Sequence, residues 1–156
     1  MIKKILYVLL GALVVVQFIR PERNVSAAAQ PNHISNKYAI PENVKGILQK
    51  ACYDCHSNNT AYPWYTNIQP LGFWIQHHVD EGKGEINFDE FLTYKPKKAH
   101  HKMEECIEMV KEKEMPLNSY TWIHGDARLT TEERTAITDW ASVVMKQIVA
   151  DSSAAQ

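Results

Sequence analysis

Cys52-Tyr53-Asp54-Cys55-His56 is the stretch that decides the fold, because a Cys-x-x-Cys-His run is typical of a c-type haem attachment site. Two thiols that lie two residues apart at the end of a helix can each add to one vinyl group of the haem. His56 then lies beneath the ring, where an imidazole nitrogen can ligate the iron. These five residues, the haem motif, predict one covalently bound haem, attached through Cys52 and Cys55.

The composition allows one compact domain with a leader or a tail. The chain has 156 residues, of which 45% are hydrophobic. Four of the 17 basic residues but only one of the 18 acidic residues precede Gln30, so the rest of the chain is mildly acidic. Because it has no basic stripe, nucleic acid is not an expected partner. The third cysteine, Cys106, has no mate outside the haem motif, which excludes a disulfide scaffold.

Residues 1–29 are expected to be a signal peptide or an N-terminal membrane anchor. Two lysines precede an apolar run over residues 5–19, as in an export signal. As a helix this run spans roughly 22 Å, against a hydrocarbon core of about 30 Å, so spanning requires flanking charged side chains to snorkel. Ala27-Ala28-Ala29 offers a cleavage pattern, but the charged residues and proline at 20–23 interrupt the path to it, which favours the anchor. Both alternatives predict a periplasmic domain, soluble or tethered to the inner membrane.

The rest of the chain is predicted to be a linker over 30–39, a haem-binding domain over 40–150 and a disordered tail over 151–156. Apolar residues recur every three or four positions, which predicts an all-α, cytochrome c-like bundle of four to five helices around the haem. Pro41 begins a helix that ends at the haem motif. Thr130 and Glu133 form a capping box that begins the last helix. Between them we expect helices around 74–79 (ending before Gly82), 88–92 (capped by Asn87) and 99–114, with loops over 57–73 and 117–129.

Several residues are candidates for the ligand on the far side of the iron. Met115 is the first candidate, because it lies in a Met-Pro pair at a helix end, where a stiff loop can present the thioether to the haem. A His/Met pair fills both axial positions, which suits electron transfer. His78 is the second candidate, since it shares a helix face with Trp74. The others are expected in the core, on solvated helix faces or in loops: Met103, Met109, His77, His100, His101, His124 and Cys106.

Other metals fit the sequence poorly. The segment around Gly84 resembles the end of an EF-hand, but Val79 and Lys83 fall where calcium needs oxygen ligands, so no calcium site is expected. A zinc module built on the two cysteines of the haem motif would need a second pair of Cys or His ligands with metal-site spacing, and none follows.

Over residues 36–146 the chain resembles the haem-binding domain family of bacterial cytochrome c-like proteins, which are periplasmic or membrane-anchored single-haem modules. The resemblance implies that Cys52 and Cys55 carry the thioether bonds and that His56 is the proximal ligand. The Met-Pro pair, by its match to cytochromes c in general, implies Met115 as the distal ligand. The stretches that carry the resemblance are the haem motif, Ser57-Asn58-Asn59-Thr60, Tyr62-Pro63-Trp64-Tyr65, Glu81-Gly82, Asn87-Phe88, Glu114-Met115-Pro116 and Tyr120.

Single-haem electron transfer to a redox partner protein is the function that the sequence favours, and such a carrier is not an enzyme. Two alternatives stay open. One is a haem-based ligand or redox sensor, in which the distal site is open or Met115 is displaceable. The other is a small haem peroxidase, in which His78 supplies acid–base help. A two-haem peroxidase is disfavoured because the chain has a single attachment motif.

Overall fold

The computed structural model describes residues 1–154, and over these residues the chain is helical, with no β-strand. This confirms the all-α fold class. The α-helices are α1 (Ile2–Val16), α2 (Glu42–Ala51), α3 (Tyr53–His56), α4 (Leu71–Glu85), α5 (Pro96–Lys111), α6 (Asn118–Thr121) and α7 (Thr131–Ala154). Four 3-10 helices lie between them: η1 (Ile34–Asn36), η2 (Trp64–Asn67), η3 (Phe91–Thr93) and η4 (Gly125–Ala127).

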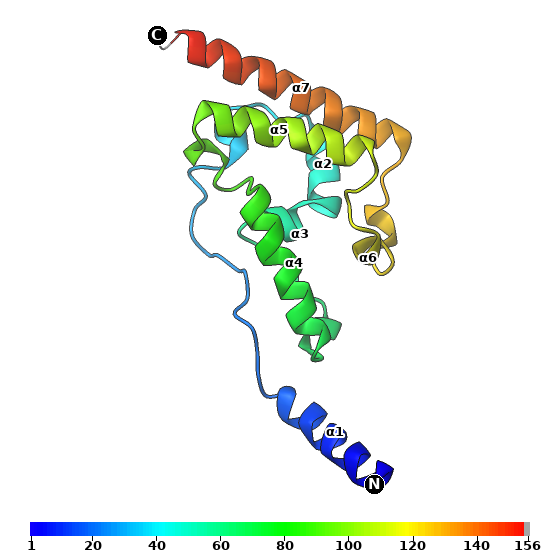
Figure 1. Cartoon of the computed structure of the whole chain (residues 1–156). Coiled ribbons are helices and arrows are strands. Elements are labelled where there is room, and N and C mark those ends of the chain that lie inside the picture. Colours follow the sequence, from blue (N-terminus) through cyan, green and yellow to red (C-terminus); the bar gives the residue numbers. More distant parts are fainter. Residues whose placement is uncertain (155–156) are drawn as a thin grey trace.

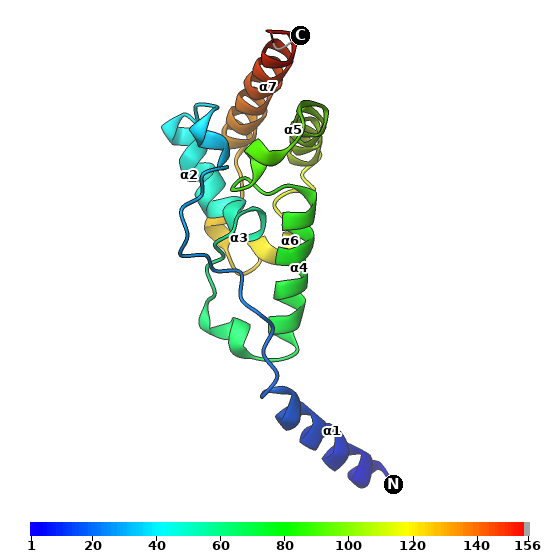
Figure 2. The same cartoon turned by 90° about the vertical axis from the view of Figure 1, so that its left-hand side faces the viewer.

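The body of the molecule is built on the antiparallel pair α5 and α7, which lie side by side along most of their length (Figure 1). The helices α2 and α3 lie under this pair, and α4 runs away from it with η2 at its far end (Figures 1 and 2). The short α6 lies across a gap from α3 and α4. The first helix, α1, projects from the end of the body that carries η2 (Figure 1).

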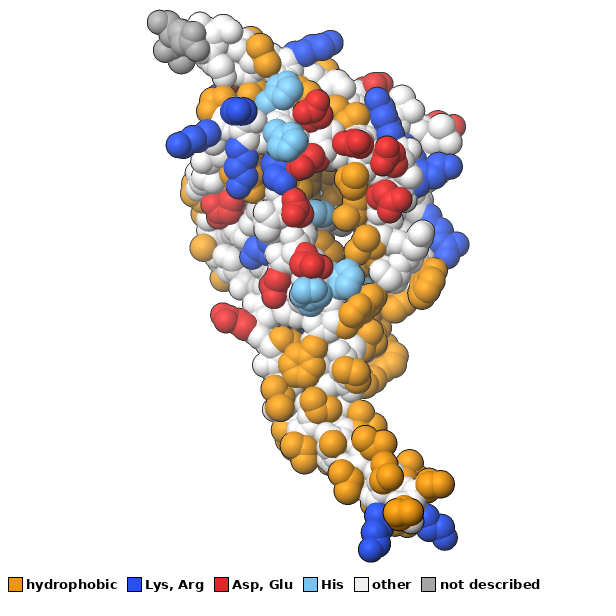
Figure 3. Space-filling model, in the orientation of Figure 1, with side chains coloured by type: hydrophobic (Ala, Val, Ile, Leu, Met, Phe, Trp, Pro, Cys, Tyr) orange, Lys and Arg blue, Asp and Glu red, His pale blue; other side chains and the backbone are white. Residues whose placement is uncertain are grey.

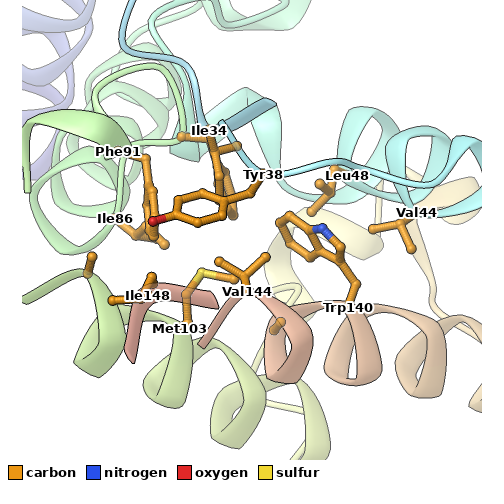
Figure 4. Packing of buried hydrophobic residues seen from close by; sticks show 13 residues of the cluster. Ile34, Tyr38, Val44, Leu48, Ile86, Phe91, Met103, Trp140, Val144 and Ile148 are labelled. Carbon is orange, nitrogen blue, oxygen red and sulfur yellow. The ribbon is translucent and has the colours of Figure 1, made fainter. Parts of the chain in front are cut away.

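The hydrophobic core lies among α2, α5 and α7 and the two segments that precede α2 and α5 (Figure 4). Ile34 is completely buried and Tyr38 is 6% exposed, so the segment expected to be a linker over 30–39 contributes to the core. The indole Nε1 of Trp140 donates a hydrogen bond of 3.0 Å to the carbonyl of Ala39, which joins α7 to the same segment. Two apolar residues in a polar stretch form too short a pattern to predict that this segment is buried.

The predictions for the first and last helices of the domain are confirmed. Pro41 directly precedes α2, and the apolar stripe of α2 is buried. At the start of α7, the Thr130 N–H donates to Glu133 Oε2 over 2.9 Å, and the Glu133 N–H donates to Thr130 Oγ1 over 3.2 Å. This reciprocal pair is the predicted capping box. The apolar face of α7 is buried at Ile137, Trp140, Ala141, Val144 and Ile148.

Four local predictions were wrong. The loop expected over 117–129 contains the short helix α6, whose turn is closed by a hydrogen bond of 3.1 Å from the Trp122 N–H to the Asn118 carbonyl. The helix expected to end before Gly82 continues as α4 to Glu85, because a glycine inside a helix costs only about 1 kcal/mol and this one is needed where α4 meets α3. No α-helix forms over 88–92: the Asn87 side chain accepts the Asp89 N–H in a turn, and only the short η3 follows. The predicted tail is helical as far as Ala154, and its last two residues lie outside the described part of the chain.

The helix α1 lies apart from the core. Its side chains are apolar apart from Lys3 and Lys4, and none of them is buried. Within the described residues, no helix is both long enough and apolar enough to cross a membrane. The chain after α1 returns to the body, where residues 17–26 run along η2 and the loop that follows the haem motif.

Candidate haem site

The haem motif begins where α2 ends and α3 starts. Cys52 is the junction residue: its N–H donates to the Leu48 carbonyl over 2.9 Å, and its own carbonyl accepts the N–H of Cys55 at 3.1 Å and of His56 at 3.0 Å. This single turn brings Cys55 and His56 back over Cys52, which is the arrangement that the spacing of the motif predicts.

The imidazole of His56 is oriented by two backbone carbonyls at the C-terminal end of α4, one inside the helix and one just after it. Its Nδ1 lies 2.8 Å from the Gly82 oxygen and 3.0 Å from the Ile86 oxygen. Because a carbonyl oxygen can only accept, Nδ1 carries the proton and Nε2 keeps its lone pair. Burial lowers the pKa of His56, so the ring is neutral at pH 7. A neutral imidazole that donates its other N–H to a carbonyl is the usual state of a metal-ligating histidine.

Both cysteines of the motif are thiols rather than half of a disulfide. Cys52 packs against the main core, where burial holds the pKa of its thiol well above the usual range. Burial, and then the neighbouring Asp54, raise the pKa of Cys55 to about 11. Neither thiol is therefore an ionised nucleophile by itself. Cys106, expected to be a buried apolar residue, packs beside Ile47 and Val110 in a second cluster, and burial raises its pKa to about 11.

Gly82 fits against the haem motif so closely that a side chain there would clash. A Cβ added to Gly82 would lie 2.8 Å from the Cys55 carbonyl oxygen and 3.0 Å from its Cβ. The same glycine presents its carbonyl to His56. In the sequence, Gly82 resembles a helix terminator, and the local pattern does not reveal this role, because the glycine lies 26 residues after the histidine.

A cavity adjoins Cys55 between the walls formed by α3 and α4 on one side and α6 on the other. It encloses about 570 Å³ of unfilled space, part of it open to solvent. Its apolar lining includes Cys55, Trp74, Val79, Leu117 and Ile123. On the face drawn in Figure 3, a hollow beneath α5 and between α4 and α6 has hydrophobic side chains in its walls.

A polar network joins the two walls of the cavity. The Tyr120 hydroxyl of α6 donates to Asp54 Oδ2 of α3 over 2.8 Å, and Asp54 Oδ1 accepts the Ala61 N–H at 3.0 Å. The Tyr120 ring stacks on His124 with centroids 4.2 Å apart, and His124 Nε2 lies 2.6 Å from the Tyr65 hydroxyl. Burial, and then Asp54, raise the pKa of Tyr120, so it is a hydrogen-bond donor at neutral pH. Neither Asp54 nor Tyr120 was singled out for this from the sequence.

The two distal candidates lie in different surroundings. His78 lines the cavity; its Nδ1 is 2.9 Å from the Trp74 carbonyl, and the ring packs at 4.4 Å from the indole. Met115 is half-buried in the loop after α5 and does not line the cavity, although Leu117 does. Its N–H donates to the Met109 carbonyl, and its own carbonyl accepts from Arg134 at 3.0 Å.

The remaining candidates are mostly remote from the cavity. Met103 is completely buried in the core, as expected. His77 and His101 are exposed beside Glu81 and Glu105, respectively. Of these remaining candidates, His124 alone lines the cavity. Among the described residues, no three His, Cys, Asp or Glu side chains come together as a metal site.

Residues 11–143 match the family model for the Haem-binding domain. The chain belongs to the haem-binding domain family. The match covers the haem motif, the walls of the cavity and the segment that joins α1 to the body. No similar chain was found among curated proteins or among solved structures. Membership of this family indicates that the chain binds haem.

Proposed function

We propose that this member of the haem-binding domain family is a single-haem c-type cytochrome that transfers electrons outside the cytoplasm. Cys52 and Cys55 would hold the haem through thioether bonds, with His56 Nε2 as the proximal ligand and Met115 as the distal ligand. The observation that carries the proposal is the orientation of His56, whose Nδ1 is held by two carbonyls while Nε2 stays available. The bound haem supplies an iron that changes between two oxidation states one electron apart.

The protein would contribute rigidity and dryness to such a site. The carbonyls of Gly82 and Ile86 hold the imidazole in one orientation, and a fixed ligand limits the rearrangement that accompanies each electron. The hydrogen bond from Tyr120 to Asp54 holds the two walls of the cavity together. The apolar lining keeps water away from the iron, which is one of the factors that set a haem's potential.

Covalent attachment is tested on the full chain produced in bacteria that attach haem c in the periplasm. A pyridine haemochrome spectrum typical of two thioether bonds, and haem that stays with the polypeptide in a denaturing gel, are expected. The Cys52→Ala/Cys55→Ala variant should lose the covalent haem, whereas Cys106→Ala should keep it. A colourless wild-type protein, or haem that separates on denaturation, would contradict the proposal.

Distal ligation by Met115 is tested against Met109, a half-buried methionine six residues earlier. Met115→Ala should abolish the near-infrared band of a Met–iron bond and lower the reduction potential, because a thioether ligand favours the reduced iron. Met109→Ala should change neither. If Met115→Ala leaves both the band and the potential unchanged, Met115 is not the ligand.

A haem-based sensor is the second candidate, and one observation favours it. His78, not Met115, lines the cavity beside Cys55, which supports a distal side that would be open to a ligand or to a displaceable side chain. Rapid carbon monoxide binding by the untreated ferrous protein would support the sensor and count against the electron carrier. Slow or absent binding would support the carrier.

A further inference from the structure

The segment that follows α1 is fastened to the body by paired hydrogen bonds. The Gln17 side chain bonds both backbone groups of Gln69: its Nε2 donates to the Gln69 carbonyl and its Oε1 accepts the Gln69 N–H, each over 2.9 Å. Arg20 donates to the Asn67 carbonyl, and Arg23 donates to Asn67 Oδ1 over 2.7 Å. We call residues 17–25 the clamp.

The clamp also reaches the loop that leaves the haem motif. The side chain of Asn24 donates to the Ser57 carbonyl at 2.8 Å and to Thr60 Oγ1 at 2.9 Å, and the Asn24 carbonyl accepts the Thr60 N–H at 2.9 Å. The Asn24 N–H donates to the Tyr62 hydroxyl at 2.8 Å. Four hydrogen bonds thus join one residue of the clamp to the chain just after His56.

Cleavage at the Ala27-Ala28-Ala29 pattern would remove every residue of the clamp. The backbone of Gln69, a residue only 1% exposed, would lose the partner of both its N–H and its carbonyl. A buried polar group left without a partner costs about 1 to 3 kcal/mol. The family match also begins within α1, at residue 11, and includes the whole clamp. These observations favour retention of residues 1–29 in the mature protein.

The end of the body beside the clamp is apolar and aromatic. Trp64 is 75% exposed and Trp122 is 77% exposed, and Ile68 and Ile123 are also exposed. Ile68 lies between the two residues that the clamp contacts. The hydrogen bond between Tyr65 and His124 brings η2 next to the end of α6. Trp64 and Ile68 therefore share one surface with Trp122 and Ile123. We call Trp64, Ile68, Trp122 and Ile123 the aromatic end.

The aromatic end is continuous with the exposed apolar surface of α1. In Figure 3, hydrophobic side chains cover α1 and the end of the body from which it leaves, whereas acidic side chains gather farther away, over the part of the body nearer α5. The helix α1 leaves on a slant toward the side that carries α6 (Figure 1). Tryptophan prefers the interface of a bilayer, where its ring is apolar and its N–H is wet. Arg20 and Arg23, both exposed, lie where lipid phosphates would be.

We propose that residues 1–29 are retained, that α1 enters the bilayer, and that the aromatic end lies on the phospholipid interface, so that the clamp fixes one orientation of the haem domain on the membrane. The occupant of the surface is lipid, because the surface is continuous with a helix whose own side chains are apolar and unburied. Ile123 belongs to the aromatic end and also lines the haem cavity, so the cavity adjoins the surface that would lie on the membrane. The inference rests on the proposed extracytoplasmic location, but not on which residue ligates the iron.

Retention is tested by the intact mass of the full chain after production in bacteria that attach haem c in the periplasm. The expected mass includes residues 1–29. A mass that corresponds to a chain beginning after Ala29 would overturn the inference. The pyridine haemochrome spectrum of the same sample reports the haem, so loss of the leader and loss of the haem are distinguished.

Orientation is tested with nitroxide labels at three residues of matched exposure in a Cys106→Ala background. The full chain, with reduced haem, is reconstituted into vesicles of phosphatidylethanolamine and phosphatidylglycerol. Ile68→Cys and Ile123→Cys replace side chains that are 48% and 57% exposed, and Val149→Cys, on α7, replaces one that is 52% exposed. The ratio of relaxation by oxygen to relaxation by a water-soluble nickel chelate should be several-fold higher at 68 and 123 than at 149. Equal ratios at all three positions would overturn the inference.

Discussion

At the residue scale, the haem motif depends on one glycine that lies far from it in the sequence. Gly82 brings the backbone of α4 against Cys55, and its carbonyl orients His56. Gly84 lies two positions later in the same helix, and a Cβ added there meets nothing within 4 Å. The two glycines therefore separate the cost of crowding the site from the ordinary effect of alanine in a helix.

Gly82→Ala should lower the yield of covalently attached haem and the free energy of unfolding, because α3 and α4 must move apart to admit the new methyl group. Gly84→Ala should leave the haem yield unchanged and raise the free energy of unfolding by up to about 1 kcal/mol, the helix propensity gained. Haem content per polypeptide and chemical denaturation measure the two effects. Equal haem yields in the two variants would contradict the role assigned to Gly82.

At the element scale, the start of α7 combines a capping box with an ion pair. Glu133 Oε1 lies 2.6 Å from Lys50 Nζ of α2, and both side chains are partly buried. The hydrogen bond from Lys50 lowers the pKa of Glu133 below its ordinary value of 4.5. The carboxylate thus links α7 to α2, the helix that ends at the haem motif.

The stability that this lowered pKa contributes is present above about pH 4.5 and is lost as the pH falls through the pKa of Glu133 in the folded state. Glu133→Gln keeps a capping-box side chain but removes the charge. It should lower the free energy of unfolding by about 1 kcal/mol or less at pH 7, and the difference from the wild type should vanish in acid. Denaturation at pH 7 and at pH 3 measures this difference. Glu42→Gln, at an 88% exposed carboxylate, is the control and should change stability little. A deficit of Glu133→Gln that persists at pH 3 would contradict the ion-pair explanation.

At the scale of the whole molecule, the segment before α2 belongs to the domain rather than to a linker. Ile34→Ala should lower the free energy of unfolding by about 2 to 5 kcal/mol, because Ile34 is completely buried in the main core. Val25→Ala is the control, since Val25 is 64% exposed. Thermal or chemical unfolding distinguishes them. Similar small effects at both positions would mean that residues 30–39 pack less firmly than the structure shows.

The cavity also makes the stability of the whole domain depend on its ligand. Its lining is largely apolar, so loss of the haem would leave apolar surface open to water. Cys52→Ala/Cys55→Ala should therefore unfold at a lower temperature than Cys106→Ala, which changes a buried thiol but keeps the attachment site. Calorimetry of the two variants makes the comparison. A haem-free protein as stable as the wild type would show that the cavity does not need to be filled.

The sequence by itself determined the features that depend on neighbouring residues. The haem motif, the helical period of α2 and α7 and the capping box at Thr130 each depend on contacts within a few positions of the chain. These local rules also predicted an all-α fold and haem as the cofactor. They failed at Gly82 and Asn87, where contacts with α3 or with a turn override the local preference.

The partners that complete the site come from distant parts of the chain and are found only in the folded molecule. The carbonyls that orient His56 come from Gly82 and Ile86 at the end of α4, the phenol that bonds Asp54 comes from α6, and the side chain that bonds Gln69 comes from the clamp. The two carbonyls lie 26 and 30 positions from His56, the other two pairs are 66 and 52 positions apart, and no periodicity in the sequence links any of them. They meet because burying the apolar faces of α2, α5 and α7 brings the connecting segments together, and each buried polar group must then find its partner there.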